Sequence, residues 1–222
     1  MQDGSFPSFG VEASGANCTF CQYNNIAAYV LKETPTFYIA TDHAPLVAGH
    51  LLIIPKQHYT CFGAAPAELD AELGALKREV QEFLARYYAP VVFWEHGIFR
   101  QTVFHAHLHC FPFGAVAYDL SQGLHDIVVH SQEDIRRWYA SRGQYFYMEQ
   151  SQTALLFAPE MERYWQIIRM IFAQAAARGG YTTPRSPELR RVEGAPLIEA
   201  TKALWRLFQQ RRLYPETSAD ST

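Results

Sequence analysis

The sequence lacks the features of a membrane-bound or secreted protein. No stretch approaches the roughly 20 consecutive apolar residues that a membrane-spanning helix needs, and residues 1–10 carry neither the basic region nor the apolar run of a signal peptide. The 222 residues include four cysteines, too few for a disulfide framework at this length. These absences predict a cytoplasmic protein without a membrane partner.

An excess of positive charge is also missing. The formal net charge is −3, whereas a general nucleic-acid-binding protein shows a basic stripe, so no nucleic-acid partner is expected. The chain contains no internal repeat and no low-complexity segment. A hydrophobic fraction of 49% allows a sizeable core, either in one elaborated domain or in two small ones.

Histidine, by contrast, is concentrated in the first half of the chain. Three histidines alternate in the segment His105-Ala-His107-Leu-His109, which lies inside an apolar run over residues 102–113. If this run is a strand, the three imidazoles share one face and the residues between them point to the other. Neutral imidazole is the usual nucleophile, proton carrier or metal ligand near pH 7, so the sequence predicts a reactive face.

The order of the predicted elements indicates an α+β fold. Aromatic and β-branched runs predict strands at 36–41 and 49–55, and apolar residues three and four apart predict an amphipathic helix over 66–88. Two more strands are expected at 90–95 and 102–113. The pattern beyond them predicts a helix at 131–142, a hairpin of strands at 144–149 and 153–157, and helices at 160–178 and 196–212.

These elements suggest three parts: a loose N-terminal arm (1–14), a catalytic domain (15–115) and a C-terminal extension (116–222) that packs on it. The amphipathic late helices fit such packing, but they also fit a homodimer interface or a lid that shapes substrate choice. The basic residues Arg185, Arg190 and Arg191 fit either a solvated helix face or a contact with a polyphosphate.

Three successive segments carry a family resemblance. They are Asp42-His-Ala-Pro45, Gly49-His50-Leu-Leu-Ile-Ile-Pro55-Lys56-Gln-His58 and Gln101-Thr-Val-Phe-His105-Ala-His107-Leu-His109. Their order and spacing resemble the signatures of the histidine triad (HIT) family, including the helix between the second and third segments. The resemblance implies a HIT-like antiparallel sheet with a long helix.

The same resemblance implies hydrolysis or transfer at the α-phosphorus of a nucleotide, through a covalent nucleotidyl-histidine intermediate. His107 would be the nucleophile and His109 would contact the α-phosphate. His50 would support both by hydrogen bonding, and His105 would complete the catalytic set.

Four further residues match substrate-binding positions of the family. Asp42 would bind the ribose hydroxyls, and Gln101 and Thr102 would reach the phosphates and the leaving group. Phe20 falls where the family packs the nucleobase, although a buried Phe needs no functional explanation.

The segment Trp94-Glu95-His96-Gly97 departs from the family pattern. The family often has Asn there, or an acidic residue followed by Gly, so the bulky Trp94 and the additional His96 leave the leaving-group pocket undefined. His96 fits a solvent-facing turn as well as a catalytic role.

Cys18 and Cys21 have the usual spacing for a tetrahedral zinc site, which needs two further ligands. The resemblance supplies them as His50 and His105, in a structural zinc site. The alternative is that both cysteines are small buried hydrophobic residues. His58 is interpreted as a local structural residue.

Three functions remain open from the sequence. The first is a hydrolase of a nucleoside phosphoramidate, a dinucleoside polyphosphate or a similar conjugate. The second is a nucleotidyl transferase or phosphorylase, although His109 stands where related transferases commonly have Gln. The third is a non-catalytic scaffold that binds a nucleotide and recruits a partner through residues 116–222.

Overall fold

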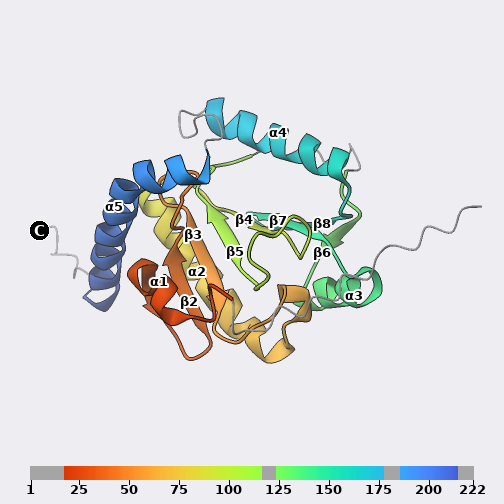
Figure 1. Cartoon of the computed structure of the whole chain (residues 1–222), viewed down its shortest axis with the longest axis horizontal. Helices are drawn as coiled ribbons and strands as arrows, with labels where there is room; N and C mark the ends of the chain where they lie inside the picture. The colour runs from red at the N-terminus through yellow and green to blue at the C-terminus, as the bar shows by residue number, and fades with distance from the viewer. Residues whose placement is uncertain (1–17, 117–123, 178–185, 215–222) are drawn as a thin grey trace, which may run out of the picture.

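One antiparallel sheet runs through the molecule. The computed structural model describes residues 18–116, 124–177 and 186–214, and the predicted arm 1–14 lies outside these ranges (Figure 1). In the described residues the strand order is β1-β2-β3-β5-β4-β7-β8-β6. The strands are β1 (Val30–Glu33), β2 (Phe37–Thr41), β3 (Leu51–Pro55), β4 (Val92–Glu95), β5 (Leu108–Phe111), β6 (Ile127–Val129), β7 (Phe146–Gln150) and β8 (Thr153–Phe157).

The helices confirm the expected α+β class. They are α1 (Tyr23–Ile26), α2 (Asp70–Tyr87), α3 (Gln132–Arg142), α4 (Met161–Ala177) and α5 (Pro187–Leu213). The predicted hairpin is present as β7 and β8, and strands from both sides of residue 115 join one sheet because β4 pairs with β7. Within the described part of the chain, no helix combines the length and apolar character needed to cross a membrane.

Two elements differ from their predicted extent. The expected strand over 102–113 is a strand only in β5, because residues 102–105 bend and the Ala106 amide donates instead to the Tyr59 carbonyl at 2.6 Å. Helix α5 begins at Pro187, not at the predicted Pro196, because the Ser186 hydroxyl caps it by accepting from the Leu189 amide at 3.3 Å.

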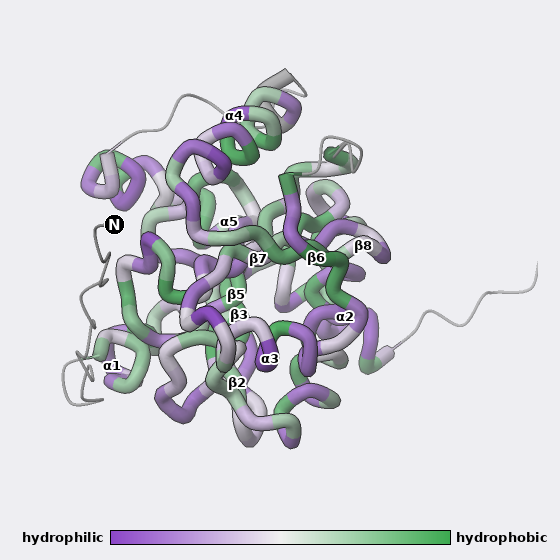
Figure 2. Tube along the Cα trace, turned by 90° about the vertical axis from the view of Figure 1, so that its right-hand side faces the viewer, coloured by the Kyte–Doolittle hydropathy of each residue, from purple (hydrophilic) through white to green (hydrophobic). Residues whose placement is uncertain are grey.

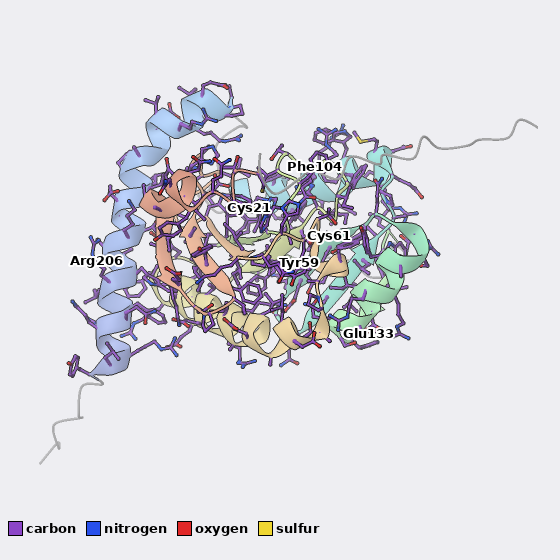
Figure 3. The ribbon with its side chains drawn as sticks, turned by 60° about the horizontal axis from the view of Figure 1, so that its bottom comes forward. Cys21, Tyr59, Cys61, Phe104, Glu133 and Arg206 are labelled. Carbon is purple, nitrogen blue, oxygen red and sulfur yellow. The ribbon has the colours of Figure 1, made fainter. Side chains whose placement is uncertain are left out.

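One face of the sheet is covered by α2, with the C-terminal part of α5 packed beside it. Phe83 of α2 contacts the rings of Trp205 and Phe208 at centroid distances of 4.9 and 5.5 Å, and Phe83 and Phe208 are fully buried. Hydrophobic and hydrophilic residues alternate along the helices, as the changing colour of α4 shows (Figure 2). Arg206 marks the outer face of α5, while Cys21 and Tyr59 lie toward the middle of the molecule (Figure 3).

The opposite face of the sheet is covered unevenly. Helix α4 packs over β4, β7 and β8, where Ile167 and Ile171 are fully buried and Trp94 contacts Phe146 at 4.2 Å. Over β2 and β3 the same face presents a small apolar cluster of Ala40, Leu52 and Ile54, with Phe20 and Tyr29 packed against it. This second half of the face forms the floor of a cavity.

Candidate active site

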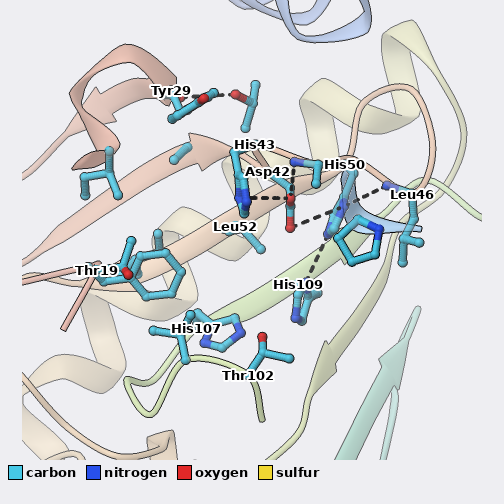
Figure 4. A pocket seen from close by; sticks show the side chains of 18 of the residues that line it. Thr19, Tyr29, Asp42, His43, Leu46, His50, Leu52, Thr102, His107 and His109 are labelled. Atoms are coloured by element: carbon cyan, nitrogen blue, oxygen red, sulfur yellow. Dashed lines mark hydrogen bonds and ion pairs between the residues drawn. The ribbon is translucent and has the colours of Figure 1, made fainter. Parts of the chain in front are cut away.

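The cavity has a volume of about 560 Å³ and brings together segments that are far apart in the sequence (Figure 4). Its apolar wall comes from Ala40 of β2, from Leu52 and Ile54 of β3, and from Phe20. Its polar wall contains His50, His107 and His109. The cavity therefore has room and matching surfaces for a ligand with one flat apolar end and one polar end.

Hydrogen bonding fixes the tautomer of His107. Its Nδ1 lies 2.7 Å from the carbonyl oxygen of His105, and a carbonyl oxygen only accepts, so Nδ1 carries the proton. A neutral imidazole has one N–H, which leaves a lone pair on Nε2. Burial lowers the pKa of His107, so this neutral form is the one present at neutral pH. The side chain lines the cavity with the electronic state of a nucleophile.

A second hydrogen-bonded chain sets the state of His109. The Leu46 amide donates to Nδ1 of His50 at 3.4 Å, so His50 carries its proton on Nε2. That nitrogen lies 3.0 Å from Nδ1 of His109, which must accept, and the His109 proton is therefore on Nε2. His109 is thus a hydrogen-bond donor in the cavity wall, as a group that binds an anionic oxygen must be.

Asp42 lies next to this pair of histidines. Its Oδ1 accepts from the Ala44 amide at 2.7 Å, which holds the turn after β2, and its Oδ2 lies 3.8 Å from Nδ1 of His50. His50 itself is buried, and burial lowers its pKa to about 4. Gly49, just before it, has φ +79° and lies against the Tyr88 ring, where a Cβ would come within 2.8 Å of a ring carbon.

His105 belongs to a different cluster. Its Nε2 lies 2.7 Å from the Pro55 carbonyl oxygen and donates to it, so the lone pair is on Nδ1. This Nδ1 lies 3.4 Å from the sulfurs of both Cys18 and Cys21. The fourth member is His58, whose Nδ1 lies 3.3 Å from the Cys21 sulfur. The structure thus places His58, and not the predicted His50, beside the two cysteines.

The Cys18–Cys21–His58–His105 cluster fits a metal ion such as zinc. One ligand atom of each residue lies within 4.8 Å of all the others. In a tetrahedral zinc site, bond lengths of about 2.3 Å to sulfur and 2.0 Å to nitrogen separate S and N by about 3.5 Å, which agrees with the separations observed here. Burial and the neighbouring Cys18 raise the pKa of the Cys21 thiol to about 11, so a cation is needed to stabilise the thiolate.

The other three predicted binding residues take distinct positions. Phe20 lines the cavity and meets the His107 ring edge-on at 5.3 Å. Thr102 is exposed at the cavity wall. Gln101 is buried and lies outside the described lining, where its amide nitrogen donates to the His105 carbonyl at 2.8 Å. Gln101 and His107 therefore donate to the same carbonyl oxygen, so Gln101 helps to hold the backbone group that orients the His107 ring.

Trp94 and His96, in the segment that departs from the family pattern, take different positions. Trp94 is buried against Phe146 under α4 and does not line the cavity, whereas His96 is half-buried in the cavity wall. Nδ1 of His96 donates to the Phe99 carbonyl at 3.1 Å, and burial lowers its pKa to about 4. The large Trp94 side chain thus lies in the core, whereas the His96 side chain reaches the cavity.

Helix α5 closes the cavity beside Asp42. Nε of Arg190 donates to the Ala44 carbonyl at 3.2 Å, and both Arg190 and Arg191 line the cavity. The helix approaches this closely because residue 194 is glycine: a Cβ there would lie 2.5 Å from Cδ of Pro45. The C-terminal extension therefore contributes directly to the cavity.

Residues 11–124 match the model of a family described as "Protein similar to CwfJ C-terminal". The chain belongs to this family. Its fold is HIT-like, which confirms the resemblance and the fold inferred from the sequence.

Individual proteins are also similar to this chain. The chain is 29% identical to an uncharacterized HIT-like protein, MG132, of Mycoplasma genitalium over 44% of this chain and 73% of that protein. It is 29% identical to the adenosine 5′-monophosphoramidase hnt1 of Schizosaccharomyces pombe over 48% of this chain and 82% of that protein. A zinc-bound histidine triad family protein from Mycobacterium smegmatis is 23% identical, covers 57% of this chain and 96% of its own, and has a TM-score of 0.40.

Proposed function

We propose that this protein is a nucleotide hydrolase that cleaves at the α-phosphorus of a nucleoside conjugate through a nucleotidyl intermediate on His107. The observation that carries the proposal is the tautomer of His107, whose Nδ1 is held by a carbonyl and whose Nε2 lone pair is available in the cavity. The phosphoramidase activity named for one relative supports the same chemistry.

The remaining groups fit a bound nucleotide. The apolar cluster with Phe20 receives the base, Asp42 accepts from the ribose hydroxyls, and the α-phosphate lies at His109. The Nε2–H of His109 donates to a phosphate oxygen, which stabilises the charge that builds up there during displacement.

The reaction then takes two steps. The Nε2 lone pair of His107 forms a bond to the α-phosphorus while the bond to the leaving group breaks, and the bonding electron pair departs with the leaving atom. A nitrogen leaving group takes up a proton, whereas a phosphate leaves as the anion. Water next attacks the phosphorus, loses a proton, and returns the P–N electron pair to His107, which releases a nucleoside monophosphate.

We propose a structural role for the Cys18–Cys21–His58–His105 cluster. Four protein ligands would surround a zinc ion and leave no open position for water, so the metal would join the Cys18–Cys21 turn to the segments around His58 and His105. His105 would then link the metal to the nucleophile, because the His105 carbonyl holds Nδ1 of His107.

The test is His107→Asn, assayed with adenosine 5′-phosphoramidate and diadenosine polyphosphates. We expect turnover to fall by at least about 10³-fold, because the nucleophile is removed, while the melting temperature changes little. Rapid quenching of the wild-type reaction with labelled substrate is expected to trap one nucleotide per chain. Wild-type activity in purified His107→Asn protein would contradict the proposal, and binding without turnover by the wild type would favour the scaffold function.

A phosphorylase would give a different product. Adding inorganic phosphate to the wild-type reaction would then yield a nucleoside diphosphate instead of a monophosphate. The two products are separated by anion-exchange chromatography, so the same assay distinguishes hydrolysis from phosphorolysis.

A further inference from the structure

The cavity has a charge that the chain as a whole does not have. Among the described residues that line it, the charged ones are Asp42, Arg100, Arg190 and Arg191. Three cations against one anion stand in contrast to the net charge of −3 for the whole sequence. Such a local excess of positive charge is typical of a site for a ligand with more than one negative charge.

The cations occupy two sides of the cavity. Arg190 and Arg191 come from α5, beside the turn that contains Asp42. Arg100 comes from the loop that also carries Thr102, whose side chain lies beside His107 (Figure 4). A nucleotide with its ribose at Asp42 and its α-phosphorus at His107 directs its leaving group toward Thr102 and Arg100.

Arg100 is held in this position by the backbone. Ile98 and Arg100 both have positive φ, 76° and 57°, in the turn after Gly97. This conformation is unfavourable for residues other than glycine, and such strained residues cluster at active sites and ligand-binding turns. The turn therefore fixes the direction of the Arg100 side chain at a conformational cost.

Helix α4 supplies a platform beneath the guanidinium. The Arg100 guanidinium carbon lies 5.3 Å from the ring centroid of Trp165 and 5.7 Å from that of Tyr164, and Nη1 lies 3.7 Å from the Met161 sulfur. Stacking on aromatic faces orients a guanidinium but leaves its charge uncompensated, because no carboxylate is involved. The described ion pairs with Asp or Glu do not include Arg100.

We propose that Arg100, positioned by Trp165 and Tyr164, binds an anionic leaving group and makes the enzyme selective for nucleotides whose α-phosphate is linked to further phosphate. This inference rests on the proposed function and narrows its substrate class. The bond that breaks is then the one between the α-phosphorus and the bridging oxygen, and its electron pair leaves on that oxygen as part of a phosphate anion. The planar guanidinium donates two N–H groups to this anion as its charge increases.

The first experiment compares two substrates with the same nucleoside, diadenosine triphosphate and adenosine 5′-phosphoramidate. Arg100→Gln is expected to lower kcat/KM for the triphosphate about tenfold more than for the phosphoramidate, as loss of one charge-assisted contact predicts. The matched control is Arg169→Gln, which removes the same charge from an exposed position of α4 outside the cavity and should leave the ratio of the two values unchanged.

The second experiment tests the platform. Trp165→Leu is expected to reduce the preference for the triphosphate, and Trp165→Phe to retain most of it, because only an aromatic ring stacks on the guanidinium. Trp165 is 40% exposed, so both variants are expected to fold. In the Arg100→Gln background Trp165→Leu should have no further effect on the ratio of the two kcat/KM values.

Equilibrium binding separates this proposal from the general one. With His107→Asn protein, Arg100→Gln should weaken binding of ADP several-fold more than binding of AMP. Equal weakening of both, or of neither, would overturn the role of Arg100 while the nucleotide hydrolase proposal stands. Failure of the protein to bind either nucleotide, or to turn over either substrate, would overturn both proposals.

Discussion

The two histidine clusters of this protein use neighbouring residues of one segment for different tasks. His105 faces two thiols and His58, whereas His109 faces His50 and lies in the cavity. His107 lies between them in the sequence. Its Nδ1 donates to the backbone carbonyl of His105, and its ring lines the same cavity as His50 and His109. The comparison shows that the hydrogen-bond partner of one ring nitrogen decides where the proton lies, and so whether the other nitrogen offers a lone pair or an N–H group.

The largest effect is expected from a substitution in the Cys18–Cys21–His58–His105 cluster. Cys18→Ser should lower the bound metal from about one ion per chain to near zero and lower the melting temperature by about 10 to 20 °C, because structural zinc contributes several kcal/mol to folding. Metal analysis and thermal unfolding measure the two effects. His50→Asn is the matched control and should retain the metal; loss of metal in His50→Asn with retention in Cys18→Ser would reverse the assignment.

The pH dependence of stability tests the second cluster, which contains His50 and His109. Burial lowers the pKa of folded His50 to about 4, whereas the unfolded residue titrates near 6.5, so the unfolded chain binds a proton that the folded chain does not. The free energy of unfolding therefore falls as the pH decreases from 6.5 toward 4. Between pH 7 and pH 5 this residue accounts for a loss of about 2 kcal/mol.

Urea unfolding of the wild type and of His50→Asn at both pH values measures this contribution. The variant should lose about 2 kcal/mol less than the wild type over the interval. Glu95 changes stability in the opposite direction, since burial raises its pKa to about 7, but it is present in both proteins and cancels in the comparison. Equal losses in the two proteins would refute the assignment of a buried neutral His50.

An effect of similar size concerns the approach of α5 to the turn that contains Pro45. Gly194→Ala should lower the free energy of unfolding by about 1 to 3 kcal/mol and weaken nucleotide binding, because the new methyl group would displace α5 from Pro45. Gly74→Ala in α2 is the control, since its Cβ would meet only the end of the Arg78 side chain at 3.5 Å. The control should gain about 0.5 to 1 kcal/mol in chemical denaturation. A gain in both variants would mean that α5 does not depend on this close approach.

Local patterns in the sequence predicted much of this fold. The spacing of apolar residues predicted α2, and two β-rich runs separated by a short polar turn predicted the β7–β8 hairpin, because both elements are defined by near neighbours. The shortened β5 was not predictable in this way. Its boundary depends on a hydrogen bond between Ala106 and Tyr59, which are far apart in the chain.

The candidate site was likewise predictable where its residues occur in local motifs, and not where they meet only in the folded chain. The triad and Asp42 were found because they occur in compact motifs, but their roles at the site remain predictions. His58 was missed, because its proximity to Cys21 arises only when the end of β3 folds toward the N-terminal turn, and the density of histidines in this half of the chain was the one available signal. Arg100 carried no sequence signal at all, since its platform on α4 lies more than sixty residues away.

The pairing of β4 with β7 has a consequence for any attempt to shorten the chain. A fragment ending at residue 115 would lose the partner of Val92–Glu95 and expose the peptide groups along one side of that strand. Trp94 would also lose Phe146, against which its ring packs. An unprotected apolar edge of this kind pairs with other chains, so a fragment ending at residue 115 is expected to aggregate and not to be stable as a separate domain.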